Sequence, residues 1–479
     1  MLLKEITNDA NVKGITCDSR KIKKGFVFVA IKGTQLNGHD FIKDAINNGA
    51  SYIVSEQEGD RVSFSFLKVK DARAAYVRLC ADFYKNPSEK LKVIGITGTN
   101  GKTTTTYLVD AILKKAGFKC GKIGTIDYSF GKRKIVASNT TPDAGLMQSL
   151  LYDMVEEELN YCIIEVSSHA LDQGRTDLIK FHSAVFTNLS KEHLDYHKTM
   201  DEYFLCKKKL FDQIKKQGYT IINIDDIYGK KLLKAIAPEA TTYGFNKAAN
   251  VRAENEKLKS KGSEFLLITL KGKIEITTSL IGRYNIYNIL AAASVALEEG
   301  VGLNVIKEAI SEFQAPPGRM ELVSLADDEY SVYVDYAHTD DALRKALTCV
   351  SELANNKIIT VFGCGGDRDK EKRPNMGKTA AEFSDFVIIT SDNPRSEDPA
   401  GIMEQIKKGL PKNYKDYLAI EDRAQAIEKA IGMAGKDDIV LLAGKGHETY
   451  QIFKHERVHF DDREIARAAL MVKKQKCLA

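Results

Sequence analysis

Residues 95–104 read GITGTNGKTT, and this stretch carries the clearest chemistry in the chain. It lies between an apolar run and a helical pattern, where a glycine-rich turn is typical of a phosphate-binding loop. Backbone N–H groups at a helix N-terminus can hold phosphate oxygens there, while Lys102 neutralises charge and the Thr103 hydroxyl can ligate Mg²⁺. Gly98 and Gly101 stand closer together than the general G-x-x-x-x-G-K-T spacing requires. The strand and helix context still predicts that the loop binds ATP.

Three further polar positions, Glu165, His193 and Asp195, follow apolar runs in the same region. Glu165 ends the apolar run 161–165, where a carboxylate could contact a metal ion near the loop. A helix cap or a buried salt bridge is an equally good interpretation of this position. His193 and Asp195 follow the run 184–190 and are similarly ambiguous, because a lone histidine is more often structural.

Four polar clusters follow apolar runs in the last third of the chain. They are residues 335–339, 363–368, 391–395 and 443–448. Ligands of open α/β sheets bind outside the carboxyl ends of the strands, so the four clusters are expected to line one crevice. Residues 363–368 lack the G-x-G-x-x-G spacing and an acidic ribose partner, which argues against nicotinamide chemistry.

These positions need a scaffold of alternating strands and helices, and the pattern predicts an α/β protein of three domains. Residues 1–88 form a smaller α/β domain ending in a linker near residues 86–90. Residues 89–315 contain continuous apolar strands separated by helices, which indicates a parallel sheet covered on both faces. Within them, residues 241–282 are expected to form antiparallel hairpins. Residues 316–479 form the third domain.

The amino-acid composition and charge distribution exclude several classes of function. The chain has 479 residues, 43% hydrophobic and 28% charged, which is the balance of a globular enzyme. Its 70 basic and 65 acidic residues are interleaved, and no basic stripe with aromatics is evident, so a nucleic-acid-dependent P-loop ATPase is disfavoured despite a pI near 8.5. No segment is apolar enough to span a membrane, and eight scattered cysteines suggest reduced thiols without a zinc site. We expect a cytoplasmic monomer that binds no nucleic acid.

Eight separated segments resemble the Mur ligase family, and most of all its MurE type. They are GTNGKTT (98–104), SNTTP (138–142), EVSSH (165–169), HLDYH (193–197), GRME (318–321), DYAHT (335–339), DNPR (392–395) and GKGHE (444–448). Their order covers nearly the whole chain. The resemblance implies a central P-loop ATPase-like parallel sheet, a C-terminal Rossmann-like doubly wound sheet, and a role in peptidoglycan synthesis.

The reaction implied by the resemblance forms an amide bond. The D-glutamyl γ-carboxylate of UDP-N-acetylmuramoyl-L-alanyl-D-glutamate attacks the γ-phosphate of ATP, and an amine of meso-diaminopimelate then displaces phosphate from the acyl phosphate. Carboxylate and triphosphate repel each other, so Mg²⁺ and Lys102 are needed to neutralise them. L-Lysine as the amine, or a reaction like that of folylpolyglutamate synthetase, remains an alternative.

The resemblance also implies roles for individual residues. The UDP-linked substrate is expected to contact Ser19, Asn139, Thr140, Thr141, Ser167, Gln173 and Arg175. The nucleotide is expected to contact Gly98, Thr99, Asn100, Gly101, Lys102, Thr103, Thr104, Asn285, Asn288, Arg319 and Asp335. The metal ions are expected to be surrounded by Thr103, Glu165, His193 and Lys207. The catalytic set is Lys102, Lys207, His193 and Glu165.

Lys207 matches the lysine that is carbamylated in the family. From the sequence alone, a surface lysine is the better interpretation. A carbamate would present anionic oxygens to Mg²⁺, whereas a bare ammonium repels the ion.

Arg395 decides which amino acid is expected. In the family, DNPR resembles the version that accepts meso-diaminopimelate, whose second carboxylate can be gripped by the planar fork of an arginine. A plain strand-to-helix turn is the alternative interpretation of this segment. The remaining pocket residues implied by the resemblance are Arg368, Asp392, Asn393, Pro394, Gly444 and Glu448, with Glu448 meeting an ammonium.

Overall fold

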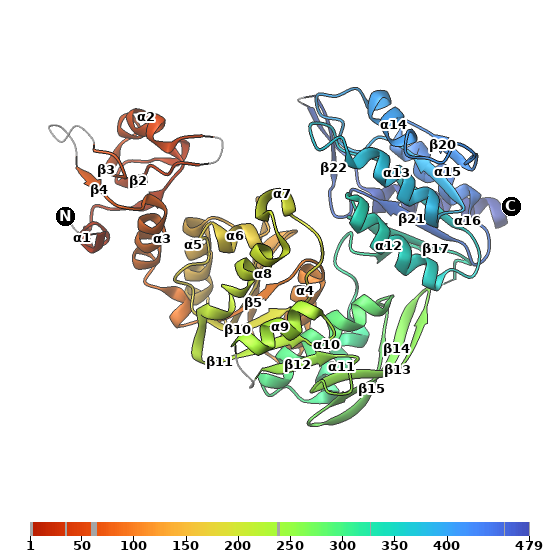
Figure 1. The fold of residues 1–479 in the computed structure, drawn as a ribbon, viewed down its shortest axis with the longest axis horizontal. Helices are drawn as coiled ribbons and strands as arrows, with labels where there is room; N and C mark the ends of the chain where they lie inside the picture. Colours follow the sequence, from red (N-terminus) through yellow and green to blue (C-terminus); the bar gives the residue numbers. More distant parts are fainter. Residues whose placement is uncertain are drawn as a thin grey trace. The chain divides into compact units, whose positions relative to one another are not determined.

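The computed structural model describes residues 3–33, 36–58, 65–236, 240–325, 327–454 and 456–478. The chain divides into two compact units, each described here by itself (Figure 1). The first comprises Met1–Arg252, Ile268–Gly272 and Tyr287–Ile306, and the second comprises Ala253–Leu267, Lys273–Ile286 and Lys307–Ala479. The α/β class with three sheet domains is confirmed, while the boundaries at residues 88 and 315 stay a prediction.

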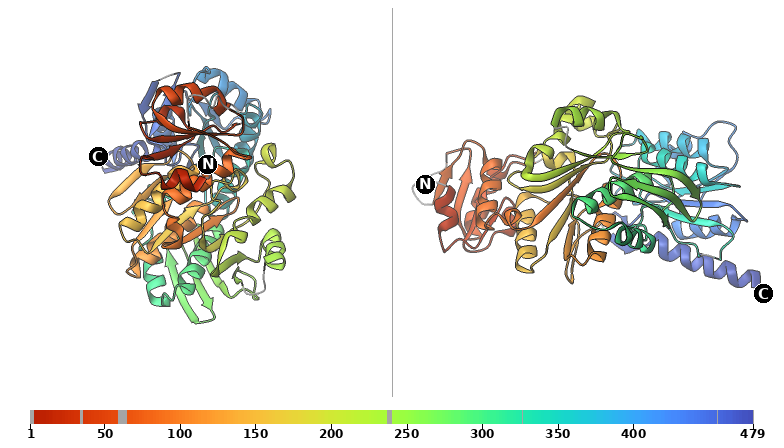
Figure 2. Two further views of the ribbon diagram at one scale, coloured as in Figure 1. Left: turned by 90° about the vertical axis from the view of Figure 1, so that its left-hand side faces the viewer. Right: turned by 90° about the horizontal axis from the view of Figure 1, so that it is seen from below.

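The N-terminal sheet has four parallel strands in the order β1-β2-β3-β4. The strands are β1 (Gly14–Thr16), β2 (Phe26–Val29), β3 (Ala50–Ser55) and β4 (Phe66–Lys68). The helices are α1 (Leu3–Asn8), α2 (Ile42–Asn47) and α3 (Ala72–Phe83). Helices pack on both faces of this sheet, which carries the label N in the right view of Figure 2. Phe28 and Ile53 point to the α2 side, whereas Val27 and Val54 pack with α3, as the alternation of a β-strand requires.

The central sheet has eleven strands in the order β15-β14-β13-β12-β11-β10-β5-β9-β6-β7-β8. Its strands are β5 (Lys92–Thr97), β6 (Cys120–Ile123), β7 (Asp127–Phe130), β8 (Arg133–Val136), β9 (Tyr161–Glu165), β10 (Phe181–Phe186), β11 (Ile214–Asn223), β12 (Thr241–Gly244), β13 (Val251–Lys259), β14 (Gly262–Thr269) and β15 (Gly272–Thr278). Its helices are α4 (Lys102–Lys115), α5 (Ala144–Glu156), α6 (Ser168–Asp172), α7 (Leu194–His197), α8 (Met200–Lys208), α9 (Ile227–Ile236), α10 (Arg283–Glu298) and α11 (Leu303–Glu312).

The predicted parallel core of this sheet is confirmed for β6, β9, β5, β10 and β11. The expectation of hairpins over residues 241–282 is wrong at its start, because β12 pairs with β11 in parallel. Strands β13, β14 and β15 do follow one another through two-residue turns, the connection that antiparallel hairpins use. The four residues of β12, TTYG, have strand-forming side chains, but nothing in their composition reveals a parallel partner.

The C-terminal sheet has six strands in the order β16-β17-β21-β18-β19-β20, parallel except for β16. The strands are β16 (Glu321–Leu322), β17 (Ser331–Asp335), β18 (Ile358–Phe362), β19 (Phe386–Ile389), β20 (Tyr417–Ala419) and β21 (Ile439–Ala443), followed by the hairpin β22 (Tyr450–Phe453) and β23 (Glu456–His459). The helices are α12 (Asp340–Leu353), α13 (Lys372–Phe383), α14 (Pro399–Lys407), α15 (Arg423–Met433) and α16 (Asp462–Leu478).

Helices cover both faces of this sheet, so the doubly wound prediction is confirmed. On β17, Tyr333 packs with α12, α13 and α14, whereas its neighbours Val332 and Val334 pack with α15 and α16. In α12 the buried positions Leu343, Leu347 and Val350 recur at helical spacing, which gives the helix one apolar face. The last helix, α16, is the long helix that carries the C-terminal label in Figure 2.

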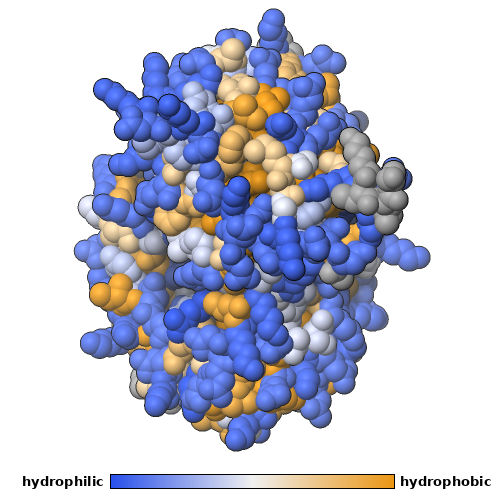
Figure 3. Space-filling model, turned by 90° about the vertical axis from the view of Figure 1, so that its right-hand side faces the viewer, coloured by the Kyte–Doolittle hydropathy of each residue, from blue (hydrophilic) through white to orange (hydrophobic). Residues whose placement is uncertain are grey.

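The surface is mainly polar. On the face drawn in Figure 3, hydrophilic residues predominate and hydrophobic residues form small scattered groups. Among the described residues, no helix is both long enough and apolar enough to cross a membrane.

Candidate active site

The loop between β5 and α4 has the geometry of a phosphate-binding loop. Gly98 and Gly101 have φ values of 150° and 86°, which favour glycine. A Cβ atom at Gly98 would clash with the Thr187 hydroxyl, and one at Gly101 would clash with the Asn288 amide. The loop therefore needs glycine at both positions, for backbone conformation and for space. The predicted strand, loop and helix are all present.

Asn188, which the sequence did not indicate, follows the neighbouring strand β10 and binds the loop through hydrogen bonds. The Asn188 carbonyl accepts a hydrogen bond from the Thr99 backbone N–H at 2.8 Å, and its side-chain oxygen accepts one from the Asn100 N–H at 3.1 Å. Lys102 folds back over the loop and donates to the carbonyls of Gly98 and Thr99 at 3.0 and 2.8 Å. Its ammonium therefore lies at the loop, where it is predicted to neutralise the negative charge of a bound phosphate.

Glu165 is fully buried beside the loop. Its carboxylate accepts hydrogen bonds from the Thr103 hydroxyl at 2.8 Å, the Thr125 hydroxyl at 2.9 Å and the Thr125 N–H at 3.0 Å. Ser167 caps the following helix, so the helix-cap interpretation of Glu165 is wrong. Thr125 also lies 3.1 Å from the Thr140 hydroxyl and so joins the carboxylate to the segment predicted to hold the UDP-linked substrate.

Lys207 is buried, with 1% of its surface exposed, so the surface interpretation of this lysine is wrong. Its ammonium nitrogen lies 2.9 Å from the Gly98 carbonyl and 4.7 Å from the centre of the Tyr203 ring. Burial, reinforced by the charge of Lys102, holds the pKa of Lys207 well below its usual value. The side chain thus reaches the loop in a setting that favours the neutral amine.

His193 stands at the start of α7 with a left-handed backbone, φ 56°. Burial lowers the pKa of its imidazole, and its ring lies 4.9 Å from that of His169. The neutral form that burial favours is the form that can ligate a metal ion. The side chain of Asp195 lies outside the described residues.

The residues predicted for the UDP-linked substrate form a second cluster next to Glu165. The Thr141 hydroxyl donates to the Glu165 carbonyl at 2.7 Å and accepts from the Ser167 N–H at 3.0 Å. Arg175 donates to the Thr141 carbonyl at 3.0 Å and to the Gln173 side chain at 2.7 and 3.0 Å.

Two more members of the predicted substrate set, Asn139 and Ser19, make hydrogen bonds to other residues. The Asn139 carbonyl accepts from the Tyr128 hydroxyl at 2.6 Å. Ser19 lies on a short 3-10 helix of the N-terminal domain, and its recorded hydrogen bonds, from Ile22 and Asn48, stay within that domain.

The remaining residues predicted for the nucleotide are divided between the two units. Asn288 belongs to the first unit, where its side-chain oxygen accepts from the Thr105 hydroxyl at 3.3 Å. Asn285, Arg319 and Asp335 belong to the second unit. There, Asp335 accepts from two backbone N–H groups at 2.8 and 2.9 Å, and burial raises the pKa of its carboxyl group.

The structure brings four of the predicted amino-acid-binding residues together. The Asn393 amide donates to the Glu448 carboxylate at 2.8 Å, and a Cβ atom at Gly444 would lie 2.8 Å from the Asp392 carboxylate. Lys445 is not among the predicted site residues, but it is fully buried, and its ammonium lies 3.3 Å from the Asn393 side-chain oxygen and 3.4 Å from the Glu448 carboxylate. Its burial appears only in the folded chain.

Arg395 follows this cluster with a left-handed backbone, φ 52°. Strand β22 supports it, because its N–H donates to the Ile452 carbonyl at 3.0 Å. Its guanidinium donates to the Gly366 carbonyl at 2.7 Å, which brings the DNPR segment to the 363–368 cluster. The segment also connects β19 to α14, so its role in binding stays a prediction. Pro394 packs against Gly366, whereas Arg368 is exposed and bonds the carbonyl of Asp367 at 3.4 Å.

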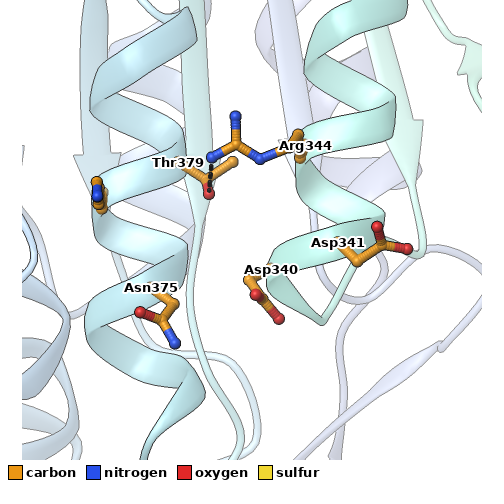
Figure 4. Close-up of a pocket in the computed structure, with 6 residues that line it drawn as sticks. Asp340, Asp341, Arg344, Asn375 and Thr379 are labelled. Atoms are coloured by element: carbon orange, nitrogen blue, oxygen red, sulfur yellow. Dashed lines mark hydrogen bonds between the residues drawn. The ribbon is translucent and has the colours of Figure 1, made fainter. Parts of the chain in front are cut away.

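A separate groove of about 230 Å³ lies between α12 and α13. It is lined by Asp340, Asp341, Arg344, Asn375, Lys378 and Thr379. Arg344 crosses it to the Thr379 hydroxyl, as Figure 4 shows, and forms a two-pronged ion pair with Glu382. The groove contains none of the predicted site residues.

These features define the class: a multidomain α/β protein with a P-loop in the first unit and a Rossmann-like sheet in the second. Family models match residues 11–84 (Mur ligase family, catalytic domain), 96–296 (Mur ligase middle domain) and 318–446 (Mur ligase, glutamate ligase domain).

Curated relatives narrow the class further. The chain is 44% identical over 463 residues to a UDP-N-acetylmuramoyl-L-alanyl-D-glutamate--2,6-diaminopimelate ligase of Clostridium botulinum, covering 96% of this chain and 95% of the relative. It is 43% identical over 470 residues to the ligase of the same name from Bacillus velezensis, covering 97% and 95%. The chain belongs to the Mur ligase family.

Solved structures agree with this assignment. One of a UDP-N-acetylmuramoyl-L-alanyl-D-glutamate--2,6-diaminopimelate ligase matches with a TM-score of 0.70 and 32% identity, covering 96% of this chain and 95% of that one. The MurF ligase of Thermotoga maritima in complex with ADP matches with a TM-score of 0.64 over 98% of both chains, at 18% identity, and shares the fold.

Proposed function

We propose that this protein is an ATP-dependent ligase that adds meso-diaminopimelate to UDP-N-acetylmuramoyl-L-alanyl-D-glutamate in peptidoglycan synthesis. The full-length likeness to ligases of that name supports the reaction. The observation that carries the proposal is the convergence of Lys102, Lys207 and Glu165 on one glycine-rich loop. A triphosphate and a substrate carboxylate can approach each other only where cations offset their charges.

In the first step, an oxygen of the substrate γ-carboxylate attacks the γ-phosphorus of ATP, the bond to the β-phosphate oxygen breaks, and ADP leaves. In the second step, a neutral amine attacks the carbonyl carbon of the acyl phosphate. Inorganic phosphate leaves with the electron pair of the C–O bond, and the nitrogen loses a proton. The contribution of the protein is to fix the reacting atoms and neutralise charge.

The residues beside the loop fit Mg²⁺. The Thr103 hydroxyl and the Glu165 carboxylate are hard oxygen ligands 2.8 Å apart, and His193 would add a neutral ring. The described residues contain no cluster of three or more His, Cys, Asp or Glu side chains able to hold a metal. Mg²⁺ usually takes one or two carboxylates together with substrate phosphates, so a sparse protein ligand set is what it needs. When bound, Mg²⁺ would offset the negative charge of the phosphates.

Lys207 is proposed to act as a carbamate. A neutral amine attacks the carbon of CO₂ and releases one proton, which gives an anionic carbamate. The buried setting of Lys207 favours that neutral amine. The product exchanges a positive charge for a negative one next to the loop, where a cation would be held.

The cluster around Arg395 is proposed to select the amino acid. Arg395 would bind the second carboxylate of meso-diaminopimelate, and Glu448 would meet an ammonium. Asp392, Asn393, Pro394, Gly444 and Arg368 would complete this pocket. Asn139, Thr140, Thr141, Ser167, Gln173, Arg175 and Ser19 would hold the UDP-linked substrate. Asn285, Asn288, Arg319 and Asp335 would hold the nucleotide together with the loop. We propose a monomer acting in the cytoplasm, where ATP is made.

The test mixes purified protein, ATP and MgCl₂ with the UDP-linked dipeptide and meso-diaminopimelate, and measures phosphate release and the mass of the product. We expect one phosphate for each tripeptide formed, and no stimulation when DNA or RNA replaces the dipeptide. Absence of phosphate release in the complete mixture would reject the ligase assignment. Equal rates with L-lysine would reject only the role of Arg395.

A further inference from the structure

A buried carboxylate far from the loop has an unusual number of donors. Glu299 follows the last residue of α10, and its side chain is 3% exposed. One oxygen accepts from the Lys92 ammonium at 2.7 Å and the Tyr161 hydroxyl at 2.6 Å. The other oxygen lies 2.8 Å from the His182 ring nitrogen and accepts from the Tyr219 hydroxyl. Each oxygen thus has two partners.

The four partners come from four strands that are neighbours in the central sheet. Lys92 and Tyr161 are the first residues of β5 and β9, His182 is the second residue of β10, and Tyr219 lies on β11. The sheet order β11-β10-β5-β9 is contiguous, the register pairs Lys92 with Tyr161, and Tyr219 pairs with Ser183, the residue after His182, which lies in a register shift of β10. Glu299 therefore joins the end of α10 to four adjacent strands of the central sheet.

The negative charge of Glu299 lies at the C-terminus of α10, where it destabilises the helix. The C-terminus of a helix carries partial negative charge, so a carboxylate there is ordinarily destabilising. Burial would also raise the pKa of Glu299, but the hydrogen bonds from His182, Lys92, Tyr161 and Tyr219 outweigh burial and lower the pKa to about 2. The carboxylate stays ionised because the strands stabilise it. The side chain of Glu299 thus links α10 to the central sheet.

The other end of α10 contacts the phosphate-binding loop. Asn288 packs against Gly101, where any side chain would clash with its amide, and it accepts from the Thr105 hydroxyl. Asn288 and Glu299 are eleven positions apart, which is roughly 16 Å along a helix at about 1.5 Å per residue. A helix behaves as a rigid rod over that length. When Glu299 fixes the C-terminal end of α10, it therefore also fixes the position of Asn288 along the helix axis relative to the loop.

We propose that Glu299 is a positioning residue for the nucleotide site, which sets the register of α10 on the central sheet and so holds Asn288 against the phosphate-binding loop. The inference rests on the proposed function, because it takes the loop to bind ATP. It adds a residue that has no contact with the loop and belongs to none of the motifs of the family resemblance.

The test compares Glu299→Gln with Glu298→Gln in the full-length protein. The amide at position 299 keeps the size of the side chain but turns one acceptor into a donor that faces other donors. Glu298 is the exposed neighbour on the same helix, bonded to the Thr241 hydroxyl. ATP binding in the presence of MgCl₂ is measured by titration calorimetry. We expect a loss of roughly fivefold to tenfold for Glu299→Gln, the size of one hydrogen bond, and none for Glu298→Gln.

A double-mutant cycle separates positioning from general destabilisation. If Glu299 acts through Asn288, then Glu299→Gln should weaken ATP binding no further once Asn288→Ala is present. Affinity for the UDP-linked dipeptide should not change in any of these variants. Tyr219→Phe, which removes one donor, provides a milder variant with the same expected pattern if Glu299→Gln fails to fold.

The outcomes distinguish the two proposals. Normal ATP binding by both Glu299→Gln and Tyr219→Phe, or losses that multiply in the double mutants, would overturn the positioning role while leaving the ligase assignment intact. Absence of ATP binding by the unmodified protein would overturn the proposed function. Normal ATP binding by Asn288→Ala would overturn the route through Asn288 even in an active ligase.

Discussion

Replacing Arg395 with alanine is expected to reduce kcat/KM for meso-diaminopimelate by roughly tenfold to a hundredfold. The change leaves the backbone comparable, because both residues carry a Cβ atom at φ 52° and incur the same left-handed strain. It removes the guanidinium and its 2.7 Å hydrogen bond to the Gly366 carbonyl. The effect on the ligand can therefore be separated from a change in backbone conformation.

The size of the expected loss in kcat/KM follows from the N–H donors of Arg395 that remain free to bind the ligand. One N–H of Arg395 is already used by the Gly366 carbonyl, and the side chain is half-buried, so water can partly replace it. A hydrogen bond to a charged group contributes about 1.5–3 kcal/mol, and about 1.4 kcal/mol is a factor of ten. Losing the equivalent of one such bond gives roughly ten to a hundredfold. Arg395→Lys keeps the charge without the planar fork and should lie between the two.

The assay ranks meso-diaminopimelate against L-lysine for each variant under saturating ATP and UDP-linked dipeptide. L-Lysine has no second carboxylate, so Arg395→Ala should change its use little. Arg344→Ala is the matched control, because Arg344 is an arginine of the same unit that pairs with Glu382 beside the separate groove. Equal losses with both amino acids, or an unchanged kcat/KM for meso-diaminopimelate, would refute the assignment of the fork to the distal carboxylate.

Four further predictions concern single groups. Lys207→Arg should lose more than about a hundredfold in kcat, since a guanidinium cannot form the carbamate, and wild-type activity should fall when bicarbonate is removed and return when it is restored. Thr125→Val should raise KM for the UDP-linked dipeptide and for Mg²⁺ together, as steady-state titrations would show, because one hydroxyl contacts both Glu165 and Thr140. Arg423→Ala should lower the free energy of unfolding by about 3–5 kcal/mol in urea titrations, since Arg423 and Asp462 form a fully buried pair. Glu299 has a pKa of about 2 in the folded protein and an ordinary pKa of 4.5 when unfolded. Its contribution to the free energy of unfolding, roughly 3 kcal/mol, is therefore present above pH 4.5 and is lost as the pH falls towards 2. Urea titrations of Glu299→Gln across this pH range should not show this loss.

The parts of the site that could be predicted from sequence are those in which neighbouring residues share one task. Residues 98–104 combine glycines, a lysine and threonines between an apolar strand and a helix, so this local context predicted a phosphate-binding loop although the glycine spacing departs from the general motif. Glu165 was noticed because a carboxylate is costly at the end of an apolar strand. Its role stayed ambiguous until the fold placed Thr103 at 2.8 Å.

The residues that were missed depend on contacts between distant segments. Thr125 follows β6, and it reaches Glu165 only because β6 and β9 are adjacent in the sheet. Glu299 looks like a solvent-exposed residue at the end of an amphipathic helix, and its four partners are spread over more than a hundred positions. No spacing rule along the chain can collect such partners. The parallel pairing of β12 was missed for the same reason.

Two buried lysines, Lys207 and Lys445, have different charged surroundings in the folded chain. An ammonium in the interior needs a counter-charge or must lose its proton. Lys445 lies 3.4 Å from the Glu448 carboxylate, which compensates its charge. The hydrogen bond of Lys207 goes to a carbonyl instead, its neighbour Lys102 is a second cation, and its pKa is held well below the usual value. This setting favours the neutral amine, which is the nucleophile that CO₂ requires, so if Lys207 is carbamylated as proposed, mass analysis of peptides trapped under bicarbonate should find the adduct at Lys207 and none at Lys445. An adduct on both lysines would mean that burial alone, and not the difference between a nearby carboxylate and a nearby cation, directs the modification.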